Sequence, residues 1–185
     1  MRGIERRIEA GRDPVVESVA SLFVSRWDVA VKDQVPADRR NRLGLAVAAQ
    51  TYKAFRELLA APRWTRLASA GAHPQRLLWA STGMKDPAGR DTLYVETLAA
   101  PGTVDTIPEK TLLAFADHGK VGTLLPADGG DAEAVIADFG RLGVDVNALA
   151  TRLQIEAGDA FKKSWSSLLA GIREKSATLI GAAAR

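Results

Sequence analysis

The chain has 185 residues, of which 46% are hydrophobic and 25% are charged, so it is long enough to bury one hydrophobic core. It contains no cysteine, which excludes disulfides and thiolate metal sites and leaves the cytoplasm as the default compartment. The mild net charge of +3 argues against nucleic acid as a partner, and no apolar run is long enough to span a membrane.

The amino-terminal third is predicted to contain two helices and one strand. Residues 3–10 are charged with two isoleucines four positions apart, and residues 39–61 carry apolar side chains at helical spacing. Between them, residues 15–24 are rich in valine, leucine and phenylalanine, which favours a strand. Polar and charged side chains begin where this strand ends, and they are Ser25, Arg26 and Asp28.

A second strand, at residues 76–80, leads into the stretch around which the chain is organised. Leu77, Leu78 and Trp79 are consecutive and apolar, which is typical of a strand covered on both faces. Hydroxyls, backbone N–H groups and an ammonium at the carboxyl end of a parallel strand can bind an oxyanion such as phosphate. This strand is followed by residues of that kind, namely Ser81, Thr82, Gly83 and Lys85.

The alternation of strand and helix continues through the middle of the chain. Short helices are predicted at residues 64–70 and 92–98, and a third strand is predicted at residues 104–107. A proline and a glycine mark the two ends of a further helix at residues 109–118. Strands and helices in this order indicate an α/β fold with a parallel sheet.

The last third of the sequence reads differently. A proline and a pair of glycines separate residues 1–125 from residues 126–185, and the second part is predicted to be a helical segment that packs on the same domain. Its expected helices lie at residues 131–142 and 146–179, and the second of them carries Phe161 and Trp165 as expected core contacts.

Four segments carry a family resemblance. They are Ser21-Leu-Phe-Val-Ser-Arg26, Gln75-Arg-Leu-Leu-Trp-Ala-Ser-Thr-Gly-Met-Lys-Asp-Pro87, Asp91-Thr-Leu-Tyr-Val95 and Thr103-Val-Asp-Thr-Ile-Pro108. Together they are similar to the carboxyl-terminal part of a transaldolase of the bacterial long type. The Trp-Ala-Ser-Thr-Gly piece is the most specific of them.

The resemblance implies a fold and a reaction. Transaldolases are (β/α)8 barrels, and this chain would supply a partial (β/α)8 barrel, about the last three strands with their helices, plus carboxyl-terminal helices. As a family they move a dihydroxyacetone unit from sedoheptulose 7-phosphate to glyceraldehyde 3-phosphate in the pentose phosphate pathway. They use a Schiff-base lysine and no cofactor, so a phosphorylated sugar is the implied partner.

Four residues fall on the positions that bind substrate or phosphate in the resembling family. Ser21 and Arg26 match a Ser-x-Phe-Val-x-Arg pattern, in which the serine lines the pocket and the arginine grips the sugar phosphate. Ser81 matches the serine of the next strand end, and Lys85 would be the second phosphate cation. An arginine gives bidentate phosphate recognition, whereas a lysine acts as a point charge. Two departures from the family pattern are a methionine at position 84 and an aspartate, in place of asparagine, at position 105.

The catalytic lysine of the family has no counterpart in this sequence. It stands in a Lys-Ile/Val-Pro-Ala-Thr context on an earlier strand, and the acidic residues and asparagine that assist proton transfer also lie upstream. We therefore predict no catalytic residue in this chain. Three parallel strands cannot close a barrel, so the chain alone is expected to be inactive, and a separate amino-terminal half is a possible partner.

From the residues alone, plainer interpretations exist. Ser21 is compatible with a packed hydroxyl, Arg26 with an ion pair to Asp28, and Lys85 with a solvated loop position. Both histidines, at positions 73 and 118, are predicted to be structural or exposed and not metal ligands.

Three functional hypotheses follow. The first is a transaldolase portion that is active only with an amino-terminal half. The second is a non-catalytic phosphosugar-binding or regulatory module, and the third is a small complete enzyme whose Lys85 forms the Schiff base.

Overall fold

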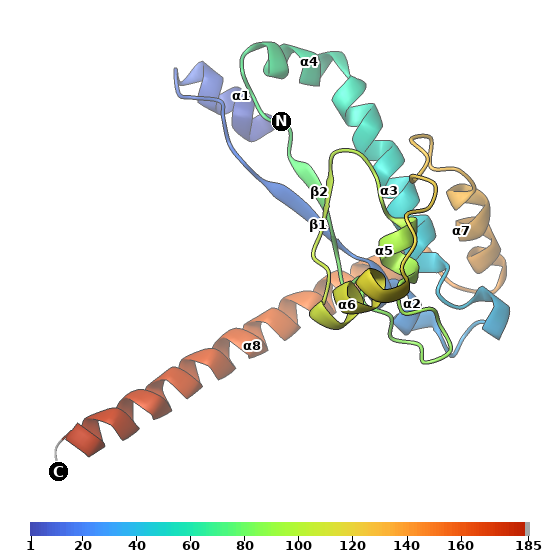
Figure 1. The fold of residues 1–185 in the computed structure, drawn as a ribbon. Coiled ribbons are helices and arrows are strands. Elements are labelled where there is room, and N and C mark those ends of the chain that lie inside the picture. The colour runs from blue at the N-terminus through green and yellow to red at the C-terminus, as the bar shows by residue number, and fades with distance from the viewer. Residues whose placement is uncertain (184–185) are drawn as a thin grey trace. The chain divides into compact units, whose positions relative to one another are not determined.

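The computed structural model describes residues 1–183, and its contacts divide the chain into two compact units, Met1–Val144 and Asp145–Arg185 (Figure 1). The first unit holds a sheet and seven α-helices among its described residues, and the second holds one long helix. The expected boundary at residue 126 falls inside the first unit, where α7 (Ala132–Arg141) packs against α3 (Leu43–Ala60). The packing of the later residues on the first unit stays a prediction.

Three parallel strands form the sheet. They are β1 (Val19–Phe23), β2 (Arg76–Ala80) and β3 (Thr103–Asp105), in the order β1-β2-β3. The register aligns Leu22 with Trp79 and Trp79 with Asp105, so the three carboxyl ends meet at one edge. The prediction of an α/β fold with a parallel sheet is confirmed.

Helices connect and flank these strands. Their starts follow local chemistry: Pro62 occupies the first turn of one helix, and Pro108 precedes another. The remaining elements of the first unit are α1 (Arg2–Glu9), α2 (Val24–Val31), a 3₁₀ turn (Ala37–Arg39), α4 (Pro62–Ser69), α5 (Leu93–Thr97) and α6 (Glu109–His118).

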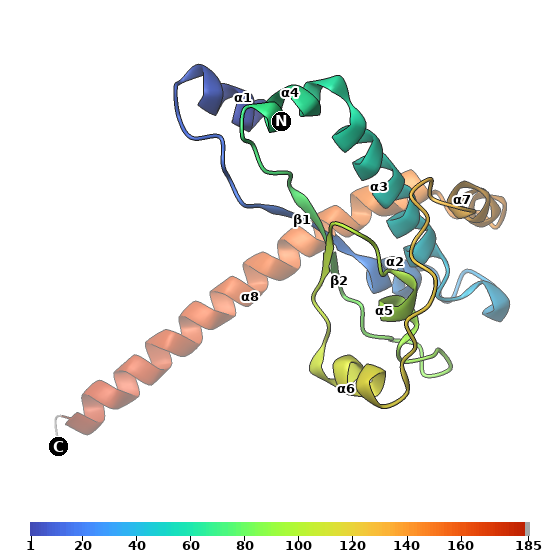
Figure 2. The same cartoon turned by 45° about the horizontal axis from the view of Figure 1, so that its top comes forward.

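The two faces of the sheet differ in what covers them. Figures 1 and 2 show α3 and α5 on the same side of β1 and β2. Because side chains alternate along a strand, the residues packed into the core on that side form one set, the covered face: Ala20, Leu22, Leu77 and Trp79. The opposite set is called the open face: it includes the buried Ala80, but its other residues are exposed or half-buried, namely Val19, Ser21, Phe23, Arg76, Leu78 and Val104.

The helix α2 corrects the sequence analysis, which predicted a strand over residues 15–24 and no helix after it. The strand ends at Phe23, and a helix begins at Val24. Its buried residues are Val24, Ser25, Asp28 and Val31, a spacing that forms one helical stripe. Two of these positions hold a serine and an aspartate, so the spacing of the apolar residues alone does not indicate a helix.

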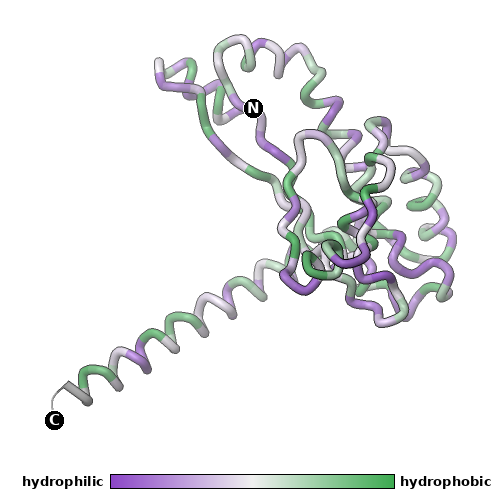
Figure 3. The backbone as a smooth tube through the Cα atoms, viewed as in Figure 1, coloured by the Kyte–Doolittle hydropathy of each residue, from purple (hydrophilic) through white to green (hydrophobic). Residues whose placement is uncertain are grey.

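The second unit consists mainly of α8 (Val146–Ala183). The Asp145 carboxylate accepts hydrogen bonds from the backbone N–H groups of Asn147 and Ala148, which begins the helix. Apolar residues recur along it (Figure 3). Phe161 and Trp165 are 60% and 61% exposed on this helix, and their core contacts, which the first unit would have to supply, stay a prediction. Over residues 1–183, no helix is both long and apolar enough to cross a membrane.

Candidate functional site

Two of the residues predicted to bind phosphate, Arg26 and Ser81, lie just after the carboxyl ends of β1 and β2. The backbone N–H of Ser25 donates to the carbonyl oxygen of Ser81 over 3.2 Å. This bond joins the start of α2, which carries Arg26, directly to the end of β2. Arg26 and Ser81 therefore belong to neighbouring chain segments at one edge, as the parallel topology requires.

Arg26 stands in the first turn of α2 and is held over the open face. Its guanidinium carbon lies 4.4 Å from the centroid of the Phe23 ring, a cation–π distance. Ser21 lies two residues before Phe23 on β1, so its exposed side chain is on the same face of the sheet. The structure thus places Ser21, Phe23 and Arg26 together on the open face.

The burial of Asp28 argues against the alternative predicted for Arg26, an ion pair with Asp28. Asp28 is buried, with 5% of its surface exposed, and points into the contact between α2 and α3. It accepts hydrogen bonds from the Gly44 backbone N–H at 3.1 Å and from the Tyr94 hydroxyl at 2.8 Å. Burial raises the pKa of Asp28 against the effect of these bonds, and burial with the nearby carboxylate raises the pKa of Tyr94.

Lys85 occupies the loop after β2 and reaches back toward α6. A side chain at Gly83 would meet Pro108 Cγ at 3.2 Å and Thr111 Oγ1 at 3.4 Å, so glycine lets this loop lie against the start of α6. The Lys85 Nζ lies 3.8 Å from the same point. An ammonium beside a helix amino terminus concentrates positive potential, and such a place attracts an anion.

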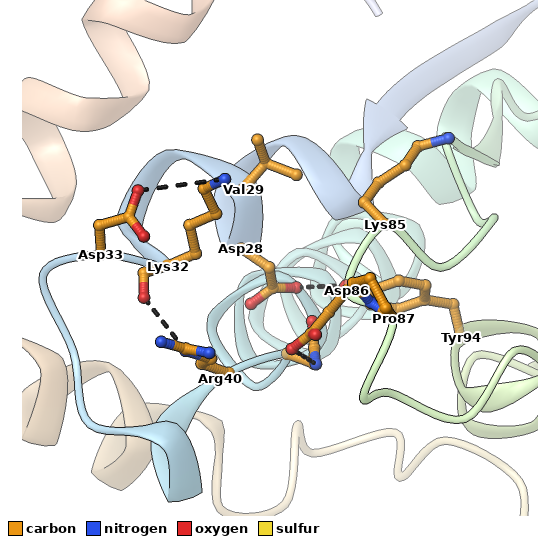
Figure 4. A pocket seen from close by; sticks show the side chains of 10 residues that line it. Asp28, Val29, Lys32, Asp33, Arg40, Lys85, Asp86, Pro87 and Tyr94 are labelled. Carbon is orange, nitrogen blue, oxygen red and sulfur yellow. Dashed lines mark hydrogen bonds and ion pairs between the residues drawn. The ribbon is translucent and has the colours of Figure 1, made fainter.

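A pocket of about 280 Å³ opens beside this loop (Figure 4). Figure 4 shows the Lys85 ammonium turned away from Asp86 and Pro87 on its wall. Of the four predicted site residues, all of them described, Lys85 is the one that contributes to this wall. The pocket is lined by Asp28, Val29, Lys32, Asp33, Arg40, Asn41, Lys85, Asp86, Pro87 and Tyr94.

Several residues that line the pocket were not predicted by the sequence analysis, and Asn41 is the clearest example. Its backbone has a φ of 58°, and its side-chain nitrogen donates to Asp86 Oδ2 at 3.0 Å. The N–H of Ala88 donates to the other oxygen of Asp86, and these two bonds lower the pKa of that carboxyl. The available signal was the asparagine just before a long helix, because asparagine tolerates positive φ better than most residues.

Neither histidine enters this site. His73 and His118 are exposed, as predicted, and their ring nitrogens contact Glu17 in one case and Asp91 and Asp117 in the other. Within residues 1–183, no group of three or more histidine, cysteine, aspartate or glutamate side chains could hold a metal ion.

The sequence profile described as "Transaldolase/Fructose-6-phosphate aldolase" matches residues 4–172. The chain belongs to this family. A transaldolase of Parafrankia sp. (strain EAN1pec) is 46% identical over 184 residues, covering 95% of this chain and 50% of the relative. A transaldolase of Neisseria meningitidis serogroup A is 39% identical over 170 residues, covering 91% of this chain and 48% of the relative. The chain spans about half the length of the curated relatives it matches.

Membership in the transaldolase/fructose-6-phosphate aldolase family agrees with the resemblance on which the site was predicted. A third relative, "Transaldolase 1" of Streptomyces coelicolor, is 44% identical over 181 residues, covering 93% of this chain and 48% of the relative. The match therefore runs through the sheet, its carboxyl edge and much of α8.

Proposed function

We propose that this chain carries the sugar-phosphate-binding portion of a transaldolase. In this proposal β1, β2 and β3 are about the last three strands of a (β/α)8 barrel. The open face then lines the barrel interior, because helices cover the outside of such barrels. The full reaction would transfer a dihydroxyacetone unit from sedoheptulose 7-phosphate to glyceraldehyde 3-phosphate, in the pentose phosphate pathway of the cytoplasm.

The observation that carries the proposal is the position of Arg26. Its guanidinium is stacked on Phe23 over the open face, and its helix is bonded to the segment that carries Ser81. A planar guanidinium fixed by stacking is preorganised for two parallel hydrogen bonds to a phosphate. Ser21, Ser81 and Lys85 would add hydroxyl donors and a second positive charge.

We further propose that the catalytic amine comes from other polypeptide. Schiff-base chemistry needs a lysine whose pKa is depressed by burial or by a cationic neighbour. None of the eight lysines in this chain, all of them described, is buried or placed on a strand. The 185 residues alone are therefore predicted to be inactive, and a polypeptide with the missing lysine should restore the reaction.

Borohydride trapping with fructose 6-phosphate tests where the amine lies. Reduction fixes a Schiff base as a stable adduct, which mass spectrometry assigns to a polypeptide. We expect no adduct on this chain alone and an adduct on an added amino-terminal half of a relative. An adduct on Lys85 of the chain alone would contradict the proposal and support a small complete enzyme.

Calorimetric titration with fructose 6-phosphate tests the phosphate site. Because a hydrogen bond to a charged group contributes about 1.5–3 kcal/mol, Arg26→Ala should weaken binding roughly ten- to hundred-fold. Arg56→Ala is the matched control, since Arg56 is an exposed helical arginine on α3, near the end of that helix next to α4. Equal affinities of the Arg26→Ala variant and the unchanged chain would eliminate the site.

A non-catalytic phosphosugar-binding or regulatory module is the second candidate. The exposure of the lysines favours it as much as it favours a split enzyme. The two functions differ in the combined experiment: the module would bind fructose 6-phosphate with dependence on Arg26 and yet give no turnover with any added amino-terminal half.

A further inference from the structure

Ser81 has an unusual backbone at the place where β2 ends. Its φ is 55°, in the left-handed region, and it is not a glycine. A residue with a Cβ is disfavoured there, and such a conformation persists only where the surrounding structure fixes it. The contacts that fix Ser81 are therefore part of the site.

The residue that follows Ser81, Thr82, is held by its buried hydroxyl. Thr82 is completely buried, and its Oγ1 donates to Asp105 Oδ1 at 2.8 Å. A hydrogen bond from a hydroxyl to an ionised carboxylate is stronger than one between neutral groups. Burial raises the pKa of Asp105, and the bond from Thr82 acts in the opposite direction. Thr82 is thus tied to the end of the next strand.

Asp105 is itself held in place. It is the last residue of β3 and lies opposite Trp79 in the register. The next residue, Thr106, donates to the Trp79 carbonyl oxygen twice, from its backbone N–H at 3.0 Å and from its hydroxyl at 3.1 Å. Asp105 is therefore a fixed acceptor, and a fixed acceptor restricts the conformations open to residues 81 and 82.

We propose that Thr82 and Asp105 are positioning residues, whose hydrogen bond holds Ser81 in the left-handed conformation and so sets the direction of its hydroxyl at the phosphate site. The inference rests on the proposed function, because it gives that site its geometry. In this proposal Thr82 and Asp105 act through Ser81 and do not bind the ligand themselves. The carbonyl of Ser81, bonded to Ser25, links the same conformation to the helix that carries Arg26.

The first test is conformational and needs no ligand. Backbone and Cβ carbon chemical shifts of Ser81, measured by NMR on the full 185-residue chain, report whether φ is positive. Thr82→Val keeps the shape of the side chain and removes the hydroxyl, so the left-handed signature should be lost. Thr82→Ser keeps the hydroxyl and should keep the signature. A signature unchanged in Thr82→Val overturns the proposal.

The second test measures affinity for fructose 6-phosphate by calorimetry. We expect Thr82→Val to weaken binding several-fold, and we expect Asp105→Asn, which keeps an oxygen acceptor, to retain most of it. If Thr82 acts through Ser81, the same Thr82→Val change should have little further effect in a Ser81→Ala background. Equal weakening in both backgrounds would indicate general loosening and overturn the positioning role.

The two experiments separate this inference from the proposed function. A chain that binds no fructose 6-phosphate, or binds it without dependence on Arg26, contradicts the proposed function. The Ser81 shifts then still decide whether Thr82 and Asp105 control that backbone. A chain that binds with dependence on Arg26 but is unaffected by Thr82→Val retains the proposed function and overturns the inference.

Discussion

The covered and open faces of the sheet are made by neighbouring residues of the same strands, yet they are used differently. On β2, Trp79 is 1% exposed, packs into the core and donates through its ring nitrogen to the Leu98 carbonyl at 3.0 Å. On β1, Val19 is 43% exposed and Ser21 is exposed. One face packs into the hydrophobic core of the first unit, and the other carries more exposed side chains.

If the proposed function is right, the covered face serves stability and the open face serves ligand binding. The covered face removes apolar area from water, which is the main favourable contribution to folding. The open face carries Ser21, Phe23 and Arg26, whose contacts hold a cation in place over it. Substitutions on the covered face should therefore change the free energy of unfolding, and substitutions on the open face should change ligand affinity.

The largest expected effect is that of Trp79→Ala. Removing a fully buried tryptophan leaves a cavity and an unpaired Leu98 carbonyl, so we expect a loss of about 3–5 kcal/mol in the free energy of unfolding. Leu78→Ala is the control on the adjacent residue, and because Leu78 is half-buried we expect a loss of about 1 kcal/mol or less. Urea denaturation measures both. Similar losses would remove the distinction between the two faces.

Gly44→Ala should be the next most damaging change, because it separates the helices that back the covered face. An added Cβ would lie 2.5 Å from the Val24 carbonyl oxygen and 2.5 Å from Asp28 Oδ2. Overpacking of this kind costs roughly 1–3 kcal/mol. The matched control is Gly140→Ala on α7, where nothing lies within 4 Å and stability should rise by roughly 0.5–1 kcal/mol. A neutral Gly44→Ala would mean that α2 and α3 can move apart without loss.

Much of the fold could be predicted because its signals are local. The predicted strand at residues 76–80 matches β2 residue for residue, and the predicted helix at 109–118 matches α6, whose ends are marked by Pro108 and Gly119. The helix α2 could not be predicted in the same way. Two of its four buried positions are Ser25 and Asp28, and their burial depends on partners in α3, on α5 and at the end of β2.

In the candidate site, too, local features could be predicted from the sequence and features that depend on tertiary contacts could not. The family resemblance implied Ser21, Arg26, Ser81 and Lys85 as site residues, and their roles remain predictions. The stacking of Arg26 on Phe23 could have been predicted from the sequence, since the two are three residues apart. The bond from Thr82 to Asp105 spans 23 positions and exists only because β2 and β3 are paired. A single sequence does not specify that pairing.

A smaller effect is expected from the buried carboxyl of Asp28, which should make the free energy of unfolding depend on pH. The pKa of Asp28 is raised by burial, so the folded chain binds this proton more tightly than the unfolded chain, whose value is near 3.8. Asp28 therefore contributes stability that is present below that value and is lost as pH rises through its folded pKa. Relative to the unchanged chain, Asp28→Asn should gain stability as pH is raised from about 3 to 7.

Asp86→Asn is the control for this titration. The pKa of Asp86 is lowered by the Ala88 N–H and by Asn41, so its contribution is lost as pH falls. Denaturation curves across pH should give the two variants opposite slopes relative to the unchanged chain. Parallel slopes would show that the burial of Asp28 does not cause the expected pH dependence of stability.

The smallest expected effect on stability is that of Phe23→Leu on the open face. Leucine keeps most of the apolar area and removes the ring under Arg26, and a cation–π contact at an exposed site contributes about 0.5–1 kcal/mol. If stacking preorganises the guanidinium, that amount should appear as roughly two- to five-fold weaker binding of fructose 6-phosphate, with little change in the urea midpoint. Phe23→Tyr keeps the ring and should bind normally. A Phe23→Leu chain that loses stability but not affinity would place Phe23 with the core residues, and the open face of β1 would then end at Ser21.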